Sequence, residues 1–283
     1  MTIDVPAKIN WTLQILEKRA DGYHTLDSIM QRISLYDTLQ IEPADALTLT
    51  VVSSDGAVPT DRRNLVLRAA EALRSGRCGR GAAITLTKRI PTGAGLGGGS
   101  ADAAAALLAL NLLWNLQLPI KTLESIGCRL GADIPYCLHD QPMRVGGIGE
   151  ILTPLAKPVP VMHLVLLKSA DSLSTKQIYE GFDSASAGPV QTRYADEWLN
   201  WVHSDRLEGA PIFPSWNDLE PVSVRLSPAI QVAKDALYEN GASFAQMTGS
   251  GTAVFGVFSN EKQAAQCAAR LNKYPVCAVC RTL

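Results

Sequence analysis

The sequence lacks a strong excess of charge of either sign. Its 26 Lys and Arg residues nearly balance 27 Asp and Glu residues, which leaves a net charge of −1. A protein whose main partner is nucleic acid or an anionic membrane usually carries a basic excess, so we expect neither partner here. This charge balance leaves a small-molecule substrate open, and it leaves both a monomer and a homodimer open.

Long apolar runs are also missing. A membrane-spanning helix needs about 18 or more consecutive apolar residues, whereas the richest stretch, "AAAALLALNLLWNL" at 103–116, is interrupted by Asn111 and Asn115. This stretch predicts a buried helix. The first residues, "MTIDVPAKINW", lack the charged start and apolar segment of a signal peptide and the Arg- and Ser-rich composition of a transit peptide. We therefore expect a cytoplasmic protein.

The cysteines and histidines lack the spacing of metal ligands. Among six cysteines only Cys277 and Cys280, in "CAVC", lie close together, and the four histidines form no HExxH pair. A zinc site would need a second pair of ligands nearby in sequence. The segment "PVCAVCRTL" is better explained as a strand with small apolar residues. We predict no structural metal ion.

Strand-like and helix-like segments alternate along the chain, which predicts a mixed α/β (α+β) fold. Period-two alternation favours strands, and apolar residues three and four positions apart favour helices. Strands are expected at 4–19, 28–43, 47–54, 81–91, 161–168, 243–251, 252–259 and 276–282, and helices at 64–76, 103–116, 120–131, 175–182, 192–205, 229–240 and 261–272. A loop and a further short strand are expected after the helix that ends near Gly131. Pro154, Pro158 and Pro160 cluster between two such runs and suggest two domains, 1–155 and 156–283.

Glycine is concentrated in the segment "PTGAGLGGGSADAA" at 91–104. Five glycines lie between residues 93 and 99, after an expected strand and before the alanine-rich helix. A helix N-terminus leaves backbone N–H groups unpaired and carries partial positive charge. Glycines let phosphate oxygens approach those groups and permit positive φ. Ser100 is placed where it can cap the helix or reach a phosphate or metal ion. We interpret the segment as a phosphate-binding loop.

Three familiar phosphate loops fit this segment poorly. The P-loop pattern GxxxxGK[ST] requires a lysine after the glycines, and none follows. Gly93, Gly95 and Gly98 match GxGxxG, but the acidic residue expected about 20 positions further on is missing, because Glu124 falls inside an expected helix. The protein-kinase loop lacks its valine and the companion HRD and DFG motifs. A dinucleotide oxidoreductase is therefore only a weak alternative.

The same segment resembles the second motif of the GHMP kinases. "PAKINWTLQILEKRADGYHTLDSIMQ" at 6–31 is similar to the first motif of that family, and "MTGSGTAVFGVF" at 247–258 to the third. The resemblance covers nearly the whole chain. It implies a small-molecule kinase that uses ATP and Mg²⁺. It also implies a two-domain GHMP kinase fold, in which an N-terminal domain like domain 2 of ribosomal protein S5 precedes a ferredoxin-like α/β sandwich.

Further segments narrow the resemblance within the family. "ADGYH" at 20–24, which other GHMP kinases lack, occurs together with "GADIPYCL", "GIGEILTP", "STKQIYEGF" and "WNDLE". These segments resemble members that transfer the ATP γ-phosphoryl group to a tertiary hydroxyl of methylerythritol carrying a cytidine diphosphate group, in the non-mevalonate route to isoprenoid precursors. The alternatives are a family member acting on a sugar, homoserine or mevalonate-type alcohol, and a nucleotide-binding protein without activity.

The resemblance implies roles for individual residues near the transferred phosphate. Asp133 matches the catalytic aspartate that accepts the hydroxyl proton, and Lys8 matches the catalytic lysine that hydrogen-bonds it. From the residues alone, a capping aspartate and a solvated lysine are the more common interpretations. Strand alternation places Asn10 on the same face as Lys8, where it is expected to contact the substrate.

The remaining expected contacts form a substrate group and an ATP group. The resemblance places cytidine between the rings of Tyr23 and Tyr179, with His24 at its polar edge, although Tyr179 is equally compatible with a helix residue packed on the core. The other substrate contacts are Thr175, Gly249, Ser250 and Gly251. The ATP contacts are Pro91, Thr92, Gly93, Ala94, Gly95, Leu96, Gly97, Gly98, Gly99, Ser100 and Ala101, with Asn64 and Lys88 near the adenine or ribose. Ser100 is also the expected contact for Mg²⁺.

Overall fold

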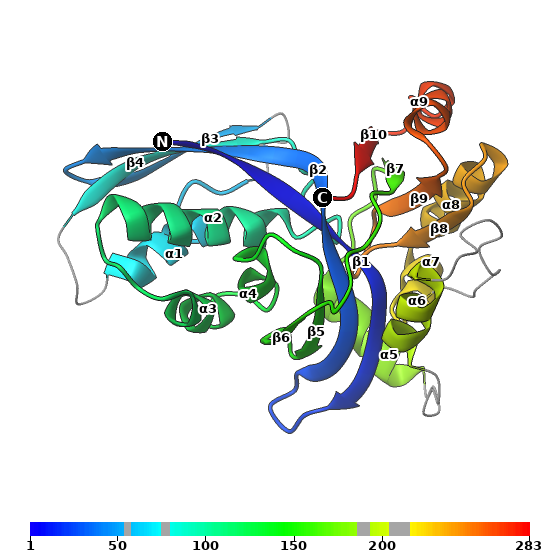
Figure 1. The fold of residues 1–283 in the computed structure, drawn as a ribbon, viewed down its shortest axis with the longest axis horizontal. Coiled ribbons are helices and arrows are strands. Elements are labelled where there is room, and N and C mark those ends of the chain that lie inside the picture. The colour runs from blue at the N-terminus through cyan, green and yellow to red at the C-terminus, as the bar shows by residue number, and fades with distance from the viewer. Residues whose placement is uncertain (54–57, 75–79, 186–192, 204–215) are drawn as a thin grey trace.

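The computed structural model describes residues 1–53, 58–74, 80–185, 193–203 and 216–283. In these ranges the chain forms a six-stranded sheet from its first half and a four-stranded sheet from its second half. Helices cover both sheets, and a long N-terminal hairpin runs between the two halves, as Figure 1 shows.

The first sheet is built around that hairpin, formed by β1 (Thr2–Lys18) and β2 (His24–Ala44). The strand order is β3-β4-β2-β5-β6, with β1 paired to β2. The other strands are β3 (Leu47–Ser53), β4 (Gly81–Lys88), β5 (Met143–Gly147) and β6 (Ile151–Pro154). The β1–β2 register shifts at three places. Such irregularities increase bend and twist, and the hairpin curves from the first sheet toward the second half (Figure 1).

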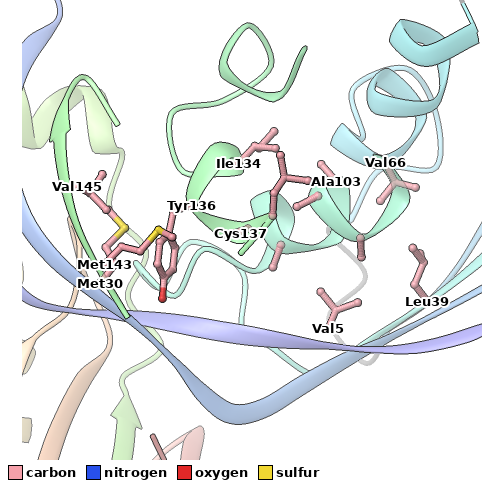
Figure 2. Packing of buried hydrophobic residues seen from close by; sticks show 14 of the residues in the cluster. Val5, Met30, Leu39, Val66, Ala103, Ile134, Tyr136, Cys137, Met143 and Val145 are labelled. Atoms are coloured by element: carbon pink, nitrogen blue, oxygen red, sulfur yellow. The ribbon is translucent and has the colours of Figure 1, made fainter. Parts of the chain in front are cut away.

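Four helices pack on one face of the first sheet (Figure 1). They are α1 (Leu65–Arg74), α2 (Gly98–Leu113), α3 (Ile120–Cys128) and α4 (Ile134–Cys137). Helix α2 is rich in alanine and leucine on all sides, a composition typical of a buried helix. Figure 2 shows its Ala103 between Val66 of α1 and Ile134 of α4, with Val5 and Leu39 of the sheet below. The small alanines allow these neighbours to approach α2 closely.

The second sheet is antiparallel in the order β10-β7-β9-β8. Its strands are β7 (His163–Lys168), β8 (Phe244–Met247), β9 (Val254–Phe258) and β10 (Val276–Arg281). The helices of this half are α5 (Thr175–Ser184), α6 (Tyr194–Val202), α7 (Glu220–Leu226), α8 (Ala229–Glu239) and α9 (Glu261–Arg270). The chain passes from one sheet to the other between β6 and β7. The domain division at residue 155 stays a prediction.

The hydrophobic core of the second half includes residues of the N-terminal hairpin. The fully buried Trp11 of β1 lies 5.4 Å from the ring of Trp198 on α6 and 5.3 Å from that of Phe255 on β9. The backbone N–H of Leu13 donates to the carbonyl of Trp216 at 2.7 Å. The second half therefore depends on the hairpin for part of its core.

The observed elements differ from the expected ones mainly at their ends, in two short helices and in the short strand β6. Helix α2 begins at Gly98, earlier than expected, because Gly98 and Gly99 are part of its first turn. The expected strand 243–251 stops at Met247, where the chain enters a glycine-rich turn with positive φ at Gly249 and Gly251. Helices α4 and α7 were not expected. Each is short and has a proline at its start, and neither shows the repeating apolar pattern of a long helix.

Candidate active site

The glycine-rich loop connects β4 to α2 and is shaped by three left-handed residues. Gly93, Gly95 and Gly97 have φ of +58°, +74° and +66°. A Cβ on Gly95 would lie 2.0 Å from the carbonyl oxygen of Thr248, and a Cβ on Gly97 would lie 2.9 Å from the side chain of Lys8. Only glycine fits positions that combine a positive φ with such close neighbours. The loop is therefore held between β1 and the turn that follows β8.

The loop ends in an uncapped helix N-terminus. Gly97 is the N-cap residue of α2, and no side chain makes a capping hydrogen bond there. Ser100 lies within the first turn rather than at the cap, so the capping alternative for Ser100 is wrong. The first N–H groups of a helix have no intrahelical acceptor and carry partial positive charge. This end of α2 is suited to an anion.

Two cavities lie on either side of the loop. One, of about 330 Å³, is lined by Asn64, Lys88, Pro91 and the start of α2. The other, of about 810 Å³, is lined by residues of both halves, including Lys8, Asp133 and Tyr179. Gly93, Gly95, Gly97 and Ser100 line both cavities. A ligand in the smaller cavity and a ligand in the larger one can therefore meet at the loop.

Lys8 and Asp133 meet in the larger cavity. Nζ of Lys8 lies 3.3 Å from Oδ2 of Asp133 and donates to Oδ1 of Asn10 at 2.6 Å. Asn10 in turn donates through Nδ2 to Ser28 at 2.8 Å, so its amide is held from both ends. The Lys8 side chain is 4% exposed and that of Asp133 32%. Asp133 makes no capping hydrogen bond to α4, and its carboxylate remains open to a ligand beside a fixed ammonium group.

The turn after β8 closes the same cavity from the second half. Gly249, Ser250 and Gly251 all line the cavity. The Oγ atoms of Ser250 and Thr175 lie 2.9 Å apart, which links the turn to the start of α5. Asn217, a residue that sequence reasoning missed, donates through Nδ2 to the carbonyl of Gly249 at 2.8 Å. The structure thus brings all the expected third-motif residues next to the loop.

The far end of the larger cavity is aromatic. Tyr23 is 59% exposed at the hairpin turn. The ring centroids of His24 and Tyr179 lie 5.1 Å apart with the planes tilted by 32°. Tyr179 packs against the hydrophobic core and lines the cavity, so it has both features that were considered for it. Asp183, also not expected, contacts His24.

The side chains of two expected ATP contacts, Asn64 and Lys88, are already bonded to neighbouring residues. The Asn64 side chain donates to the carbonyl of Pro59 at 2.8 Å and accepts from the N–H of Val66 at 2.9 Å, so it organises the start of α1. Lys88 is buried and pairs with the carboxylates of Asp37 and Asp102, the latter at 2.8 Å. Both residues still line the smaller cavity. Their functional groups support its wall.

Burial and neighbouring charges shift the pKa values of Lys88 and Asp102. Burial lowers the pKa of Lys88, but the two carboxylates outweigh burial and raise it. Burial raises the pKa of Asp102 to about 7, and the negative Asp37 adds to the effect while Lys88 opposes it. Among the residues that the structure describes, none is a hydrogen-bond partner of the buried Oδ1 of Asp102. Sequence reasoning missed both aspartates, because nothing local marks a pairing across 51 and 14 positions.

Two features are absent from the described residues. No helix in these ranges combines the length and the apolar composition needed to cross a membrane. The same ranges bring no group of three His, Cys, Asp or Glu side chains together as a metal site.

Two family models match this chain. The model of the GHMP kinases N terminal domain matches residues 64–141, and that of the GHMP kinases C terminal domain matches residues 207–277. Together they cover more than half of the 283 residues. The chain belongs to the GHMP kinase family. Membership makes it an ATP-dependent small-molecule kinase.

Relatives of this GHMP kinase align over most of its length. Proteins named 4-diphosphocytidyl-2-C-methyl-D-erythritol kinase include one from Cereibacter sphaeroides strain KD131, 41% identical over 260 residues, 91% of this chain and 89% of the relative. Another, from Moorella thermoacetica, is 41% identical over 285 residues, 100% of this chain and 99% of the relative.

Solved structures agree with the family. A crystal structure of 4-(cytidine 5'-diphospho)-2C-methyl-D-erythritol kinase has a TM-score of 0.83 and 31% identity, covering 100% of this chain and 99% of that one. Homoserine kinase from Cytophaga hutchinsonii, at a TM-score of 0.70 and 19% identity, covers 100% of this chain and 94% of its own and shares the fold. The expected family and two-domain α/β (α+β) fold are confirmed. The roles of the site residues stay predictions.

Proposed function

We propose that this kinase transfers the γ-phosphoryl group of ATP to the 2-hydroxyl of 4-diphosphocytidyl-2-C-methyl-D-erythritol, giving the 2-phosphate and ADP, in the non-mevalonate route to isoprenoid precursors. The observation that carries the proposal is the Lys8–Asp133 pair, 3.3 Å apart, in a cavity of about 810 Å³ with an aromatic far end. The names of the relatives support the substrate.

The geometry suits a positioning mechanism. Phosphoryl transfer depends mainly on alignment and charge stabilisation. In this proposal Asp133 accepts the proton of the attacking hydroxyl, while the Lys8 ammonium stabilises negative charge between Asp133 and the phosphate. Because Asn10 fixes the ammonium at 2.6 Å, little rearrangement is needed when the substrate binds. A ligand that fills the cavity excludes water from the phosphoryl group that is transferred.

Nucleotide binding is proposed for the smaller cavity. The adenosine of ATP would lie near α1, and its triphosphate would follow the loop to the first turn of α2, whose N–H groups face it. Mg²⁺ usually binds proteins through one or two side chains together with phosphate oxygens and water. Ser100 fits that need, since it lies in both cavities and does not cap α2. The metal would supply charge neutralisation at the phosphates.

Two broader expectations belong to the same proposal. We propose a cytoplasmic enzyme, as its role in precursor synthesis implies, and a monomer or homodimer. Size-exclusion chromatography with light scattering separates the two oligomeric states.

A coupled ADP-release assay tests the function. Wild type is expected to turn over the cytidine diphosphate conjugate with ATP and Mg²⁺, and Asp133→Asn to lose at least about 100-fold in kcat. Asp140→Asn, the same change at an exposed site seven residues further along, serves as the matched control. Activity that survives in Asp133→Asn removes the base from the mechanism. Turnover of homoserine, mevalonate or a sugar, but not of the conjugate, would show that the proposed substrate is wrong.

A further inference from the structure

Asp183, near the end of α5, joins the second half of the chain to the tip of the N-terminal hairpin. Its Oδ1 lies 2.6 Å from Nε2 of His24, and its Oδ2 accepts from Nζ of Lys18 at 2.5 Å. Lys18 and His24 face each other across the end of the β1–β2 pair. One carboxylate therefore holds both strands of the hairpin at the mouth of the larger cavity.

These contacts do more for orientation than for stability. The exposed fractions of the side chains are 55% for Lys18 and 27% for Asp183, and ion pairs in such surroundings contribute little free energy of folding. The His24 side chain is 6% exposed and stays nearly buried. The hydrogen bond from Lys18, and then that from His24, lowers the pKa of Asp183. The carboxylate thus remains ionised and can only accept hydrogen bonds.

An acceptor at Nε2 decides which nitrogen of His24 carries the proton. Because ionised Asp183 has no proton to donate, Nε2 of His24 must be the donor. In the neutral imidazole the other nitrogen, Nδ1, then has a free lone pair. Among the described residues no partner bonds to Nδ1. The Tyr179 ring, 5.1 Å away, limits rotation of the imidazole. His24, which lines the larger cavity together with Tyr23 and Tyr179, consequently carries a hydrogen-bond acceptor at Nδ1.

We propose that Asp183 is a positioning residue that makes the site select cytosine over uracil. The inference rests on the proposed function, since it concerns the base of that substrate. Cytosine has an amino donor at N4, where uracil and thymine have a carbonyl acceptor at O4. An acceptor at Nδ1 pairs with the amino group. Against O4 it places two lone pairs together, which leaves both buried acceptors unsatisfied.

The test compares cytidine and uridine diphosphate conjugates of the same alcohol in wild type and Asp183→Asn. The asparagine amide can accept from or donate to Nε2, so the protonation of His24 is no longer fixed. The ratio of kcat/KM for the cytidine conjugate to that for the uridine conjugate is expected to fall at least about tenfold. The change should lie in KM, with kcat on the cytidine conjugate within about threefold of wild type, because Asp183 does not touch the reacting atoms.

Two further measurements separate positioning from a structural role. The ¹⁵N spectrum of His24 is expected to show the Nε2–H tautomer in wild type and a mixture in Asp183→Asn. Asp235→Asn, the same substitution on the exposed face of α8, is the matched control and should leave the ratio and the spectrum unchanged. An equal rise in KM for both conjugates, or a wild-type His24 that is an imidazolium or an Nδ1–H tautomer, overturns the proposal.

The test also distinguishes this inference from the proposed function. If wild type turns over neither conjugate, the proposed function fails. Binding of CDP and UDP, measured by calorimetry, still reports selection of the base by the same residues. A preference for CDP that disappears in Asp183→Asn supports the role of Asp183. Equal affinity of wild type for CDP and UDP refutes it.

Discussion

Replacing Lys88 by methionine tests the buried cluster beneath the phosphate loop. The side chain of Asp37 is 0% exposed and that of Asp102 3%. Asp37 keeps two backbone donors, the N–H groups of Arg89 and Ile90 at 2.5 and 2.8 Å. Asp102 loses its donor, and its second oxygen already has none. Removing one partner of a buried ion pair costs about 3–5 kcal/mol, and we expect a loss of that size at pH 8.

The loss depends on pH with a definite sign. Burial already raises the pKa of Asp102 to about 7, far above its value in the unfolded chain. The folded protein therefore binds more protons than the unfolded one, and stability falls as pH rises through this range. Without Lys88 the pKa rises further, and the fall continues to higher pH. One pKa unit corresponds to about 1.4 kcal/mol, so the deficit of Lys88→Met should grow by about 1 kcal/mol between pH 6 and pH 8.

Urea unfolding at both pH values measures these differences. Asp102→Asn removes the titrating charge and serves as the matched variant. The double variant Lys88→Met, Asp102→Asn should be more stable than Lys88→Met alone at pH 8, because it leaves no unpaired carboxylate at position 102. A Lys88→Met loss that is the same at pH 6 and pH 8, or that stays below about 1 kcal/mol, refutes the reasoning.

Three further outcomes are expected. Gly95→Ala places a Cβ 2.0 Å from the Thr248 carbonyl and should lower the urea midpoint far more than Gly22→Ala, which has a similar φ of +87° but no neighbour within 4 Å; equal midpoints would contradict this. Asn217→Ala removes hydrogen bonds to the carbonyls of Met247 and Gly249 and should cost about 1–3 kcal/mol in unfolding free energy, together with a higher KM. EDTA should stop ADP release without changing the urea midpoint, and a lowered midpoint would point to a structural metal instead.

Periodic segments and the phosphate loop were predictable because their signals are local. The glycines at 93–99 predict a helix N-terminus that is open to an anion, and helix α2 begins within this segment. Strand alternation correctly placed Lys8 and Asn10 on one face, where their side chains hydrogen-bond. The resemblance to a family located Asp133, whose surroundings in sequence look like an ordinary helix start.

Residues that act through distant partners were not predictable. Asp37 reads as an ordinary polar position of a strand, and only the fold brings it to Lys88. Asp183 reads as an exposed residue at a helix end, yet it meets His24 across 159 positions. Asn217 lies in "WNDLE", which suggested family membership but no contact with the glycine turn. Pairings of this kind depend on tertiary placement, which leaves no periodic trace along the chain.

The shared hairpin has a consequence for how the chain folds during synthesis. Its strands are made first, yet Leu13 bonds to residue 216, Asn10 to Thr248, and Arg32 to Leu283. At about 5–20 residues per second, the ribosome needs many seconds to supply these partners after β1 has emerged. Until then Trp11 has no core to enter. The apolar strands of the nascent N-terminal half therefore stay exposed and accessible to chaperones. Native burial of Trp11 is expected only late in translation.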